Sequence, residues 1–251
     1  MRLKIGALLI GLLLISNSAL AFKPSLNWIL KKTASAQIER RISSLKIEQD
    51  LTLFGIKSAP RGYQTTQRAW LRAPYAVREE IRLPEGTRVS VYTQKRSLTV
   101  SPDGERKARK SGPNFFAHLI AGGGPNDSES LANRLLRDLE AYGVDTQKIS
   151  YGRMDGRIAH VIGARPYEKT KPQVWIDKES YHPLRVVVAG KSAGKNIVRE
   201  LRFSGWGSSE AGGWYPKIIE RFDEGLLTER AVTKKAERNI TLERGLFDTA
   251  Q

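Results

Sequence analysis

The segment VWIDKESYHPLRVVV, residues 174–188, has the alternation of apolar and polar side chains that is typical of a β-hairpin. Two short apolar runs flank the polar residues 178–183, which we expect to form the turn. Proline lacks a backbone N–H and fits only the first position of a strand, so Pro183 places the start of the return strand at Leu184. Such a hairpin belongs to an antiparallel sheet with one apolar face, formed by Val174, Ile176, Leu184, Val186 and Val188.

The same alternation recurs along most of the chain and predicts about eleven strands in total. Because helical segments occur only at the start and in the middle, the pattern indicates the α+β class, with one antiparallel sheet and not two domains. Besides the hairpin, the expected strands are residues 45–53, 67–72, 75–83, 87–93, 96–101, 148–154, 157–163, 196–203, 215–222 and 226–233.

Three segments have the apolar spacing of helices. Residues 25 to about 44 predict an amphipathic helix with Ser25 available as its N-cap. Residues 115–120 predict a short apolar helix, and residues 128–142 predict a longer one with a leucine at every fourth position, ending before Gly143. Two interpretations of the middle pair stay open: the helices cover an ordinary core, or they form a lid over an apolar concavity.

The first 21 residues have the three parts of a secretory signal peptide: a basic start, a short apolar run, and the ending Ala19-Leu20-Ala21. The apolar run is shorter than the roughly 20 residues that a spanning helix needs, which favours cleavage after Ala21 over an uncleaved anchor. We therefore expect a periplasmic protein in which residues 22–251 form one domain. The sequence has no cysteine, so it offers neither disulfides nor a lipobox cysteine for acylation.

Several of these features resemble the outer-membrane lipoprotein carrier family, the LolA-like periplasmic proteins. The resemblance rests on Trp175 and Asp177 at the end of a strand, on Pro183-Leu184-Arg185 after the turn, and on the order of helices and strands around them. Residues 238–247 also resemble the end of carrier-family chains, with an asparagine-led strand and a terminal phenylalanine. The resemblance implies an unclosed half-barrel, with the N-terminal helix and a helical lid in its concavity.

The same resemblance implies a function. It predicts a non-enzymatic carrier, without a cofactor, that binds the acyl chains of lipoproteins or phospholipid and moves them towards the outer membrane. Its partners would be an inner-membrane release machinery and an outer-membrane acceptor. The alternative on the same fold is an envelope-stress sensor or regulatory binding module.

The net charge of +16 would indicate nucleic acid in a cytoplasmic protein. Export changes the expected anions to phospholipid, lipopolysaccharide and wall polymers, so we predict no nucleic-acid partner. The simpler interpretation is that the basic residues solvate the outer surface.

Catalytic and metal sites find little support in the sequence. Gly190-Lys191-Ser192-Ala193-Gly194 matches the nucleophile elbow of serine hydrolases, but a strand is expected after it where the elbow needs a helix. All three histidines precede Ser192, against the order of that triad. Glu79 and Glu80 are neighbours in a strand and point to opposite faces, so they cannot share a substrate. The histidines are scattered and show no metal-ligand spacing.

The remaining candidate is an apolar cavity between the curved sheet and the helices, where each buried CH₂ of an acyl chain contributes about 0.8 kcal/mol. The lid candidates are Phe115, Phe116, Leu119 and Ile120. The cavity candidates are Trp70, Leu71, Val77, Ile81, Val89, Val91, Val174, Ile176, Val186, Leu201 and Phe203.

Overall fold

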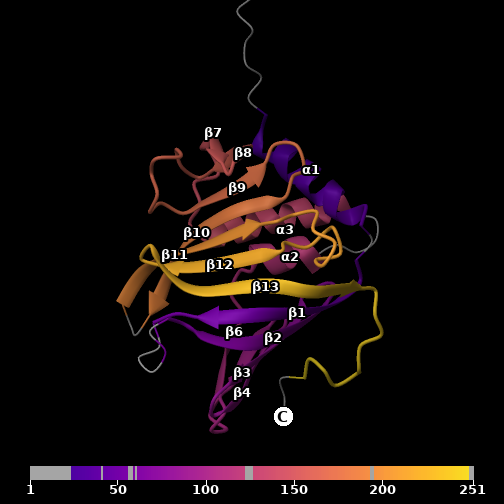
Figure 1. The fold of residues 1–251 in the computed structure, drawn as a ribbon. Helices are drawn as coiled ribbons and strands as arrows, with labels where there is room; N and C mark the ends of the chain where they lie inside the picture. The colour runs from indigo at the N-terminus through magenta and orange to yellow at the C-terminus, as the bar shows by residue number, and fades with distance from the viewer. Residues whose placement is uncertain are drawn as a thin grey trace, which may run out of the picture.

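The computed structural model describes residues 24–40, 42–55, 59, 61–121, 127–192 and 195–248. In these residues, thirteen strands form one antiparallel sheet with the order β6-β5-β4-β3-β2-β1-β13-β12-β11-β10-β9-β8-β7. Its two edges, β6 and β7, are not joined, so the sheet stays open (Figure 1). This confirms the predicted α+β fold with a single unclosed sheet. The predicted signal peptide lies outside the described residues.

The strands follow the chain as a series of antiparallel neighbours. They are β1 (Ser44–Leu53), β2 (Tyr63–Arg72), β3 (Ala76–Leu83), β4 (Gly86–Tyr92), β5 (Arg96–Val100), β6 (Arg106–Lys110), β7 (Ile149–Met154), β8 (Arg157–Ile162), β9 (Gln173–Asp177), β10 (Pro183–Ser192), β11 (Lys195–Ser204), β12 (Ile218–Asp223) and β13 (Leu226–Arg238).

The helices lie together on one face of the sheet, behind β9 to β12 in Figure 1. We call this the inner face and the opposite side the outer face. They are α1 (Leu26–Ile38), α2 (Phe115–Ala121) and α3 (Ser128–Ala141). The chain runs from one edge strand, β6, to the other, β7, through α2 and α3, so both helices must cross the inner face.

The helix ends follow the predicted capping. The Ser25 side chain accepts a hydrogen bond from the backbone N–H of Trp28 at 3.3 Å, and the Asp127 carboxylate accepts one from that of Ser130 at 2.8 Å. Gly143 follows α3 with φ of 73°, a left-handed conformation that glycine adopts without strain. These caps confirm both predicted helix starts, although α1 ends at Ile38 and is shorter than expected.

One half of the inner face is a solid core. Leu131, Leu135 and Leu139 form a buried row on α3 and pack with α1 against β9 and β10. Each of the three leucines is at most 1% exposed. The i, i+4 spacing that predicts the helix is therefore also its packing surface.

Two strand predictions are wrong. The structure has thirteen strands where the sequence predicts about eleven, and β6 is the strand that no expected range covers: its sequence Arg-Lys-Ala-Arg-Lys is exposed throughout and forms a strand by pairing with β5. The closing strand predicted at residues 238–247 does not form, because β13 ends at Arg238 and Asn239 turns the chain with φ of 57°. The Asn239 side chain accepts a hydrogen bond from Ser43 N at 2.9 Å and fixes this turn.

The central hairpin forms as predicted, with Pro183 at the first position of β10, but one side chain changes face. The pairing with β9 shifts between Pro183 and Arg185. This irregularity turns Leu184 to the outer face, where it packs with Trp175, while Val186 faces the helices with Val174.

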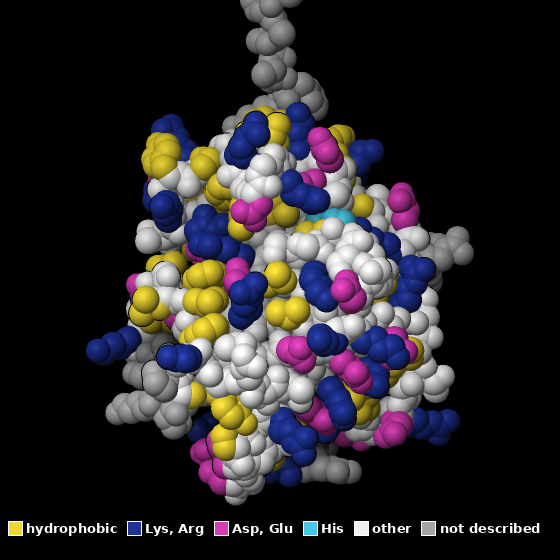
Figure 2. Space-filling model, viewed as in Figure 1, with side chains coloured by type: hydrophobic (Ala, Val, Ile, Leu, Met, Phe, Trp, Pro, Cys, Tyr) yellow, Lys and Arg dark blue, Asp and Glu magenta, His cyan; other side chains and the backbone are white. Residues whose placement is uncertain are grey.

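The outer face carries both signs of charge. Figure 2, seen from this side, shows lysine and arginine side chains intermixed with aspartate and glutamate. Cross-strand and same-strand ion pairs contribute, among them Arg230 with Glu220 at 3.6 Å and Lys46 with Glu48 at 3.0 Å. On the side seen in Figure 2, the distribution fits the interpretation that basic residues solvate the surface.

Candidate functional site

The other half of the inner face is hollow. A cavity of about 600 Å³, which we call the inner cavity, lies between α2 and the inner faces of β1 to β5 and β11 to β13. Its volume falls within the roughly 300–1,000 Å³ typical of small-molecule sites. The apolar part of its wall is formed by Leu51, Ala69, Leu71, Val77, Ile81, Phe116, Leu201, Phe203, Ile219 and Ala231.

Aromatic rings close the cavity on the side of α2. The Phe116 ring stacks on that of Phe203 with a centroid separation of 4.4 Å, and lies 5.9 Å from that of Tyr215. Phe203 comes from β11 and Tyr215 from the segment before β12, so α2 rests on one strand of the sheet and on the connection that leads to the next. These contacts are apolar and non-directional, so no directional hydrogen bond takes part in them.

Polar contacts attach α2 to the other helices instead. Gln37 on α1 donates to the carbonyl of Ile120 at 2.7 Å. His118 on α2 lies 2.5 Å from the carboxylate of Asp138 on α3, through its Nδ1 atom. A few side-chain hydrogen bonds therefore join α2 to α1 and α3, in addition to the buried packing of Phe115, Leu119 and Ile120.

The inner cavity also contains ionisable groups on facing strands. Glu79 lies on β3 and Arg88 on β4, opposite Arg221 on β12 and Glu229 on β13. Arg221 and Glu229 form an ion pair at 2.9 Å. Among the described residues no ion pair within 4 Å involves Glu79. The cavity is thus amphipathic, with an apolar wall and a polar band.

Glu79 is the group most affected by this environment. Burial raises the pKa of its carboxyl to about 7, and the negative charge of Glu229 adds to the effect. Arg88 and Arg221 act in the opposite direction without cancelling it. Near neutral pH Glu79 is therefore divided between its protonated and ionised forms.

This shift predicts how stability depends on pH. The folded protein holds the Glu79 proton up to about pH 7, whereas an unfolded glutamate loses it near the ordinary glutamate pKa of 4.5. The folded state therefore binds more protons between these values, and the free energy of unfolding falls as the pH rises through the window. The side chain of Glu79→Gln cannot ionise. Between pH 5 and pH 8 the free energy of unfolding of this variant should therefore fall by about 1–3 kcal/mol less than that of the unmodified protein, measured by urea denaturation.

Glu80→Gln is the matched control for this prediction. Glu80 is the next residue on β3 but lies on the outer face, in an ion pair with Arg78 at 2.6 Å. Its pH profile should follow that of the unmodified protein. A Glu79→Gln profile parallel to that of the unmodified protein would contradict the assignment.

The structure brings only some of the predicted residues together at the cavity. Leu71, Val77, Ile81, Leu201 and Phe203 line it, as does the lid candidate Phe116. The other candidates lie in packed core and not at the cavity: Val174, Ile176 and Val186 on the inner face of the sheet under α1 and α3, Phe115 and Leu119 on α2 in the same core, and Ile120 on α2 against β1 and β2.

Trp70, Val89 and Val91 lie on the outer face, so their predicted place in the cavity is corrected. Trp70 follows Ala69, which faces the cavity, and neighbouring residues in a strand point to opposite sides. In the β3–β4 pair Ile81 lies opposite Arg88, and Val77 opposite Tyr92. The register therefore points Arg88, Ser90 and Tyr92 inward and Val89 and Val91 outward.

Sequence reasoning missed the polar band, although a signal existed. Glu79 stands between Val77 and Ile81 in the inward-facing series of β3, so the same alternation that predicts the apolar wall also points its carboxyl inward. A charged residue in such a series is unusual for a simple core.

The remaining chemistry is limited among the described residues. β10 and β11 pair as a hairpin around residues 193–194, so a strand follows Ser192, and the strand-turn-helix context of a nucleophile elbow is not met. No group of three His, Asp or Glu side chains in the described ranges could hold a metal ion. Of the helices described, none is long and apolar enough to cross a membrane.

A single unclosed antiparallel sheet, helices in its concavity and a cavity beneath one of them define the LolA-like half-barrel fold. The chain has this fold. Over 90% of its length and 99% of the other chain, it superposes with a TM-score of 0.52 on a LolA superfamily protein from Nitrosomonas europaea, at 10% sequence identity. A DUF1329 family protein from Desulfovibrio piger matches with the same TM-score, identity and coverage. No family model and no curated protein matches the sequence.

Proposed function

We propose that this protein is a non-enzymatic periplasmic carrier that binds the acyl chain of a lipoprotein or lipid in the inner cavity. The observation that carries the proposal is the cavity itself: about 600 Å³, with an apolar wall, under a short helix. The LolA-like fold supports the same conclusion, since its unclosed sheet forms a half-barrel whose concavity can hold a ligand.

Burial of the acyl chain supplies the binding energy. Each CH₂ transferred from water to the apolar wall contributes about 0.8 kcal/mol, so ten buried methylenes contribute roughly 8 kcal/mol before the costs of association. The acyl chain would lie along Leu71, Val77 and Leu201, and its polar end would meet the band around Arg88 and Glu79. An amphipathic ligand therefore fits this cavity better than a pure hydrocarbon.

In this proposal α2 moves when the ligand enters. Its contacts with the sheet are the aromatic stack of Phe116 on Phe203 and other apolar packing, which can re-form around an acyl chain. The hydrogen bond that Gln37 donates to Ile120 and the one that Asp138 accepts from His118 tie α2 to α1 and α3, so these helices would guide the movement. In this proposal α2 is the lid, and α3 is its fixed support.

The carrier would be exported by the signal peptide of residues 1–21 and function as one domain, residues 22–251. By the resemblance to the carrier family, it would receive its cargo from inner-membrane machinery and deliver it to an outer-membrane acceptor. A regulatory module on the same fold would instead bind a protein segment and need no lipid.

Mass spectrometry of the natively purified protein tests the proposal. The protein is isolated without detergent from a lysate that contains membranes, and its bound small molecules are extracted and identified. We expect a lipid or lipoprotein acyl chain in near-stoichiometric amount. Lipid at no more than the level found with an unrelated exported protein would overturn the carrier function.

A further inference from the structure

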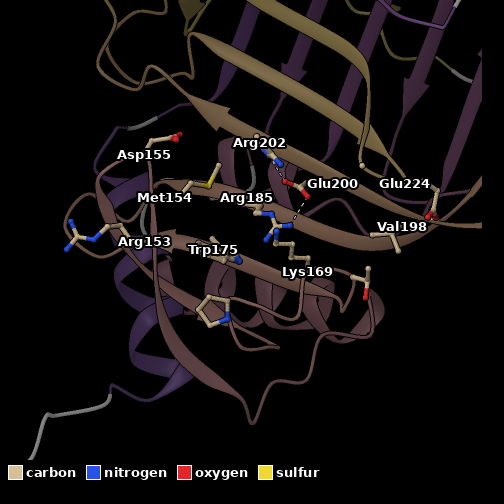
Figure 3. A pocket seen from close by; sticks show the side chains of 13 residues that line it. Arg153, Met154, Asp155, Lys169, Trp175, Arg185, Val198, Glu200, Arg202 and Glu224 are labelled. Carbon is tan, nitrogen blue, oxygen red and sulfur yellow. Dashed lines mark hydrogen bonds and ion pairs between the residues drawn. The ribbon is translucent and has the colours of Figure 1, made fainter.

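A second hollow lies on the outer face of the sheet, on the opposite side from the inner cavity. This outer hollow measures about 590 Å³ and is bordered by the β7–β8 turn, the loop before β9 and the β12–β13 turn (Figure 3). Its base is formed by Trp175, Arg185, Glu200 and Arg202, from three neighbouring strands. The register places them together, since Arg185 pairs with Trp175 on one side and with Arg202 on the other.

Charge at the base of the outer hollow is predominantly positive. The dashed lines in Figure 3 join Glu200 to both Arg185 and Arg202. Burial alone would raise the pKa of Glu200, but the hydrogen bonds from Arg185 and Arg202 outweigh it and hold that pKa below its usual value. One carboxylate is thus shared by two guanidinium groups, which leaves an excess positive charge.

Arg185 has a donor without an acceptor. The residue is only 8% exposed, and its Nη2 atom donates to Glu200 at 2.7 Å while its guanidinium lies 5.5 Å from the centre of the Trp175 ring. Its Nε atom is buried and has no hydrogen-bond partner among the described residues. A buried N–H without an acceptor is unfavourable, so Arg185 keeps an unused donor beside the outer hollow.

The rim of the outer hollow carries both signs of charge, with Arg153 and Lys169 beside Asp155 and Glu224, so the lining as a whole keeps four cationic against three anionic side chains. Lys169, from the loop before β9, lines it and has no carboxylate within 4 Å among the residues described. The Trp175 ring and Met154 supply apolar surface beside these cations. We infer that the outer hollow binds a small amphipathic anion, whose carboxylate or phosphate group accepts from Arg185 and whose apolar body lies on Trp175.

NMR titration of the full chain tests this inference. The probes are phenyl phosphate, benzoate and the uncharged benzyl alcohol, and the readout is the indole N–H signal of Trp175. We expect a saturable shift with at least one of the two anions and at least a tenfold weaker effect with benzyl alcohol. The preferred anion then identifies the recognised group as phosphate or carboxylate.

Two variants locate the anion. Arg185→Lys keeps the charge but lacks the Nε donor and should weaken binding at least tenfold. Lys169→Ala changes an exposed side chain, does not threaten folding, and should weaken binding several-fold, whereas the exposed Lys95→Ala on the β4–β5 turn should not. Equal shifts with charged and uncharged probes, or binding unaffected by Lys169→Ala, would overturn the inference. The outer hollow and the inner cavity have no lining residue in common, and Glu79 lies on β3, away from the strands of the outer hollow, so Glu79→Gln in the cavity should leave anion binding unchanged.

Discussion

Leu201→Asp is expected to reduce acyl-chain binding at least tenfold while the protein keeps its fold. Leu201 lies on β11 with its side chain half-buried and facing the inner cavity. Without a ligand, the new carboxylate can be hydrated inside the cavity. A bound acyl chain would remove this water, and burial of an uncompensated charge costs well over the 1.4 kcal/mol that corresponds to tenfold in affinity.

Titration with a fluorescent long-chain fatty acid measures this effect, and circular dichroism checks the fold. The matched control is Leu226→Asp, which makes the same chemical change at a leucine that is 73% exposed at the start of β13. The control should bind with unchanged affinity. If both variants bind like the unmodified protein, the acyl chain does not occupy the inner cavity.

Leu135→Ala is expected to have the largest effect on stability, lowering the free energy of unfolding by about 2–5 kcal/mol. Leu135 is fully buried in the middle of the apolar row of α3, where it belongs to the core that includes Val174 and Val186. Truncation removes apolar contacts and leaves a cavity that the surrounding sheet can fill only in part.

Urea denaturation measures this loss, and Arg137→Ala is its control on the exposed side of the same helix. The control should change the free energy of unfolding by no more than about 0.5 kcal/mol. A loss below about 1 kcal/mol for Leu135→Ala would mean that α3 does not hold the fold together.

These two variants separate the halves of the inner face. Under α1 and α3 the space is filled by the protein's own side chains, as in an ordinary core. Under α2 the same sheet leaves about 600 Å³ open. The structure thus shows α3 over a packed core, and α2 between core and cavity: Phe115, Leu119 and Ile120 are buried in the core while Phe116 lines the cavity. The lid role of α2 remains part of the proposal.

The sequence predicts the fold well where local chemistry determines it. The hairpin at residues 174–188, the cap at Asp127 and the glycine after α3 all follow from side-chain alternation, capping and backbone freedom. Strand β6 could not be predicted, because its charged sequence carries no alternation and depends on pairing with β5.

The site was harder to predict because it depends on register. Alternation shows which residues of one strand share a face. The pairing with the neighbouring strand then decides which alternate residues of that neighbour lie on the same face of the sheet. In β4 that pairing turns Arg88 inward and Val89 outward, so an apolar pattern alone selected the wrong residues. The position of Leu184 depends in the same way on the shift after Pro183.

A crystal structure of the protein with a fatty acid brominated near its methyl end tests the central claim most directly. The anomalous signal of bromine locates the acyl chain without reference to the protein model. We predict a peak inside the inner cavity, between Leu71 on β2, Leu201 on β11 and Phe116 on α2. A peak confined to the outer hollow or to the protein surface, or no peak at a saturating concentration, would contradict acyl-chain transport by this fold.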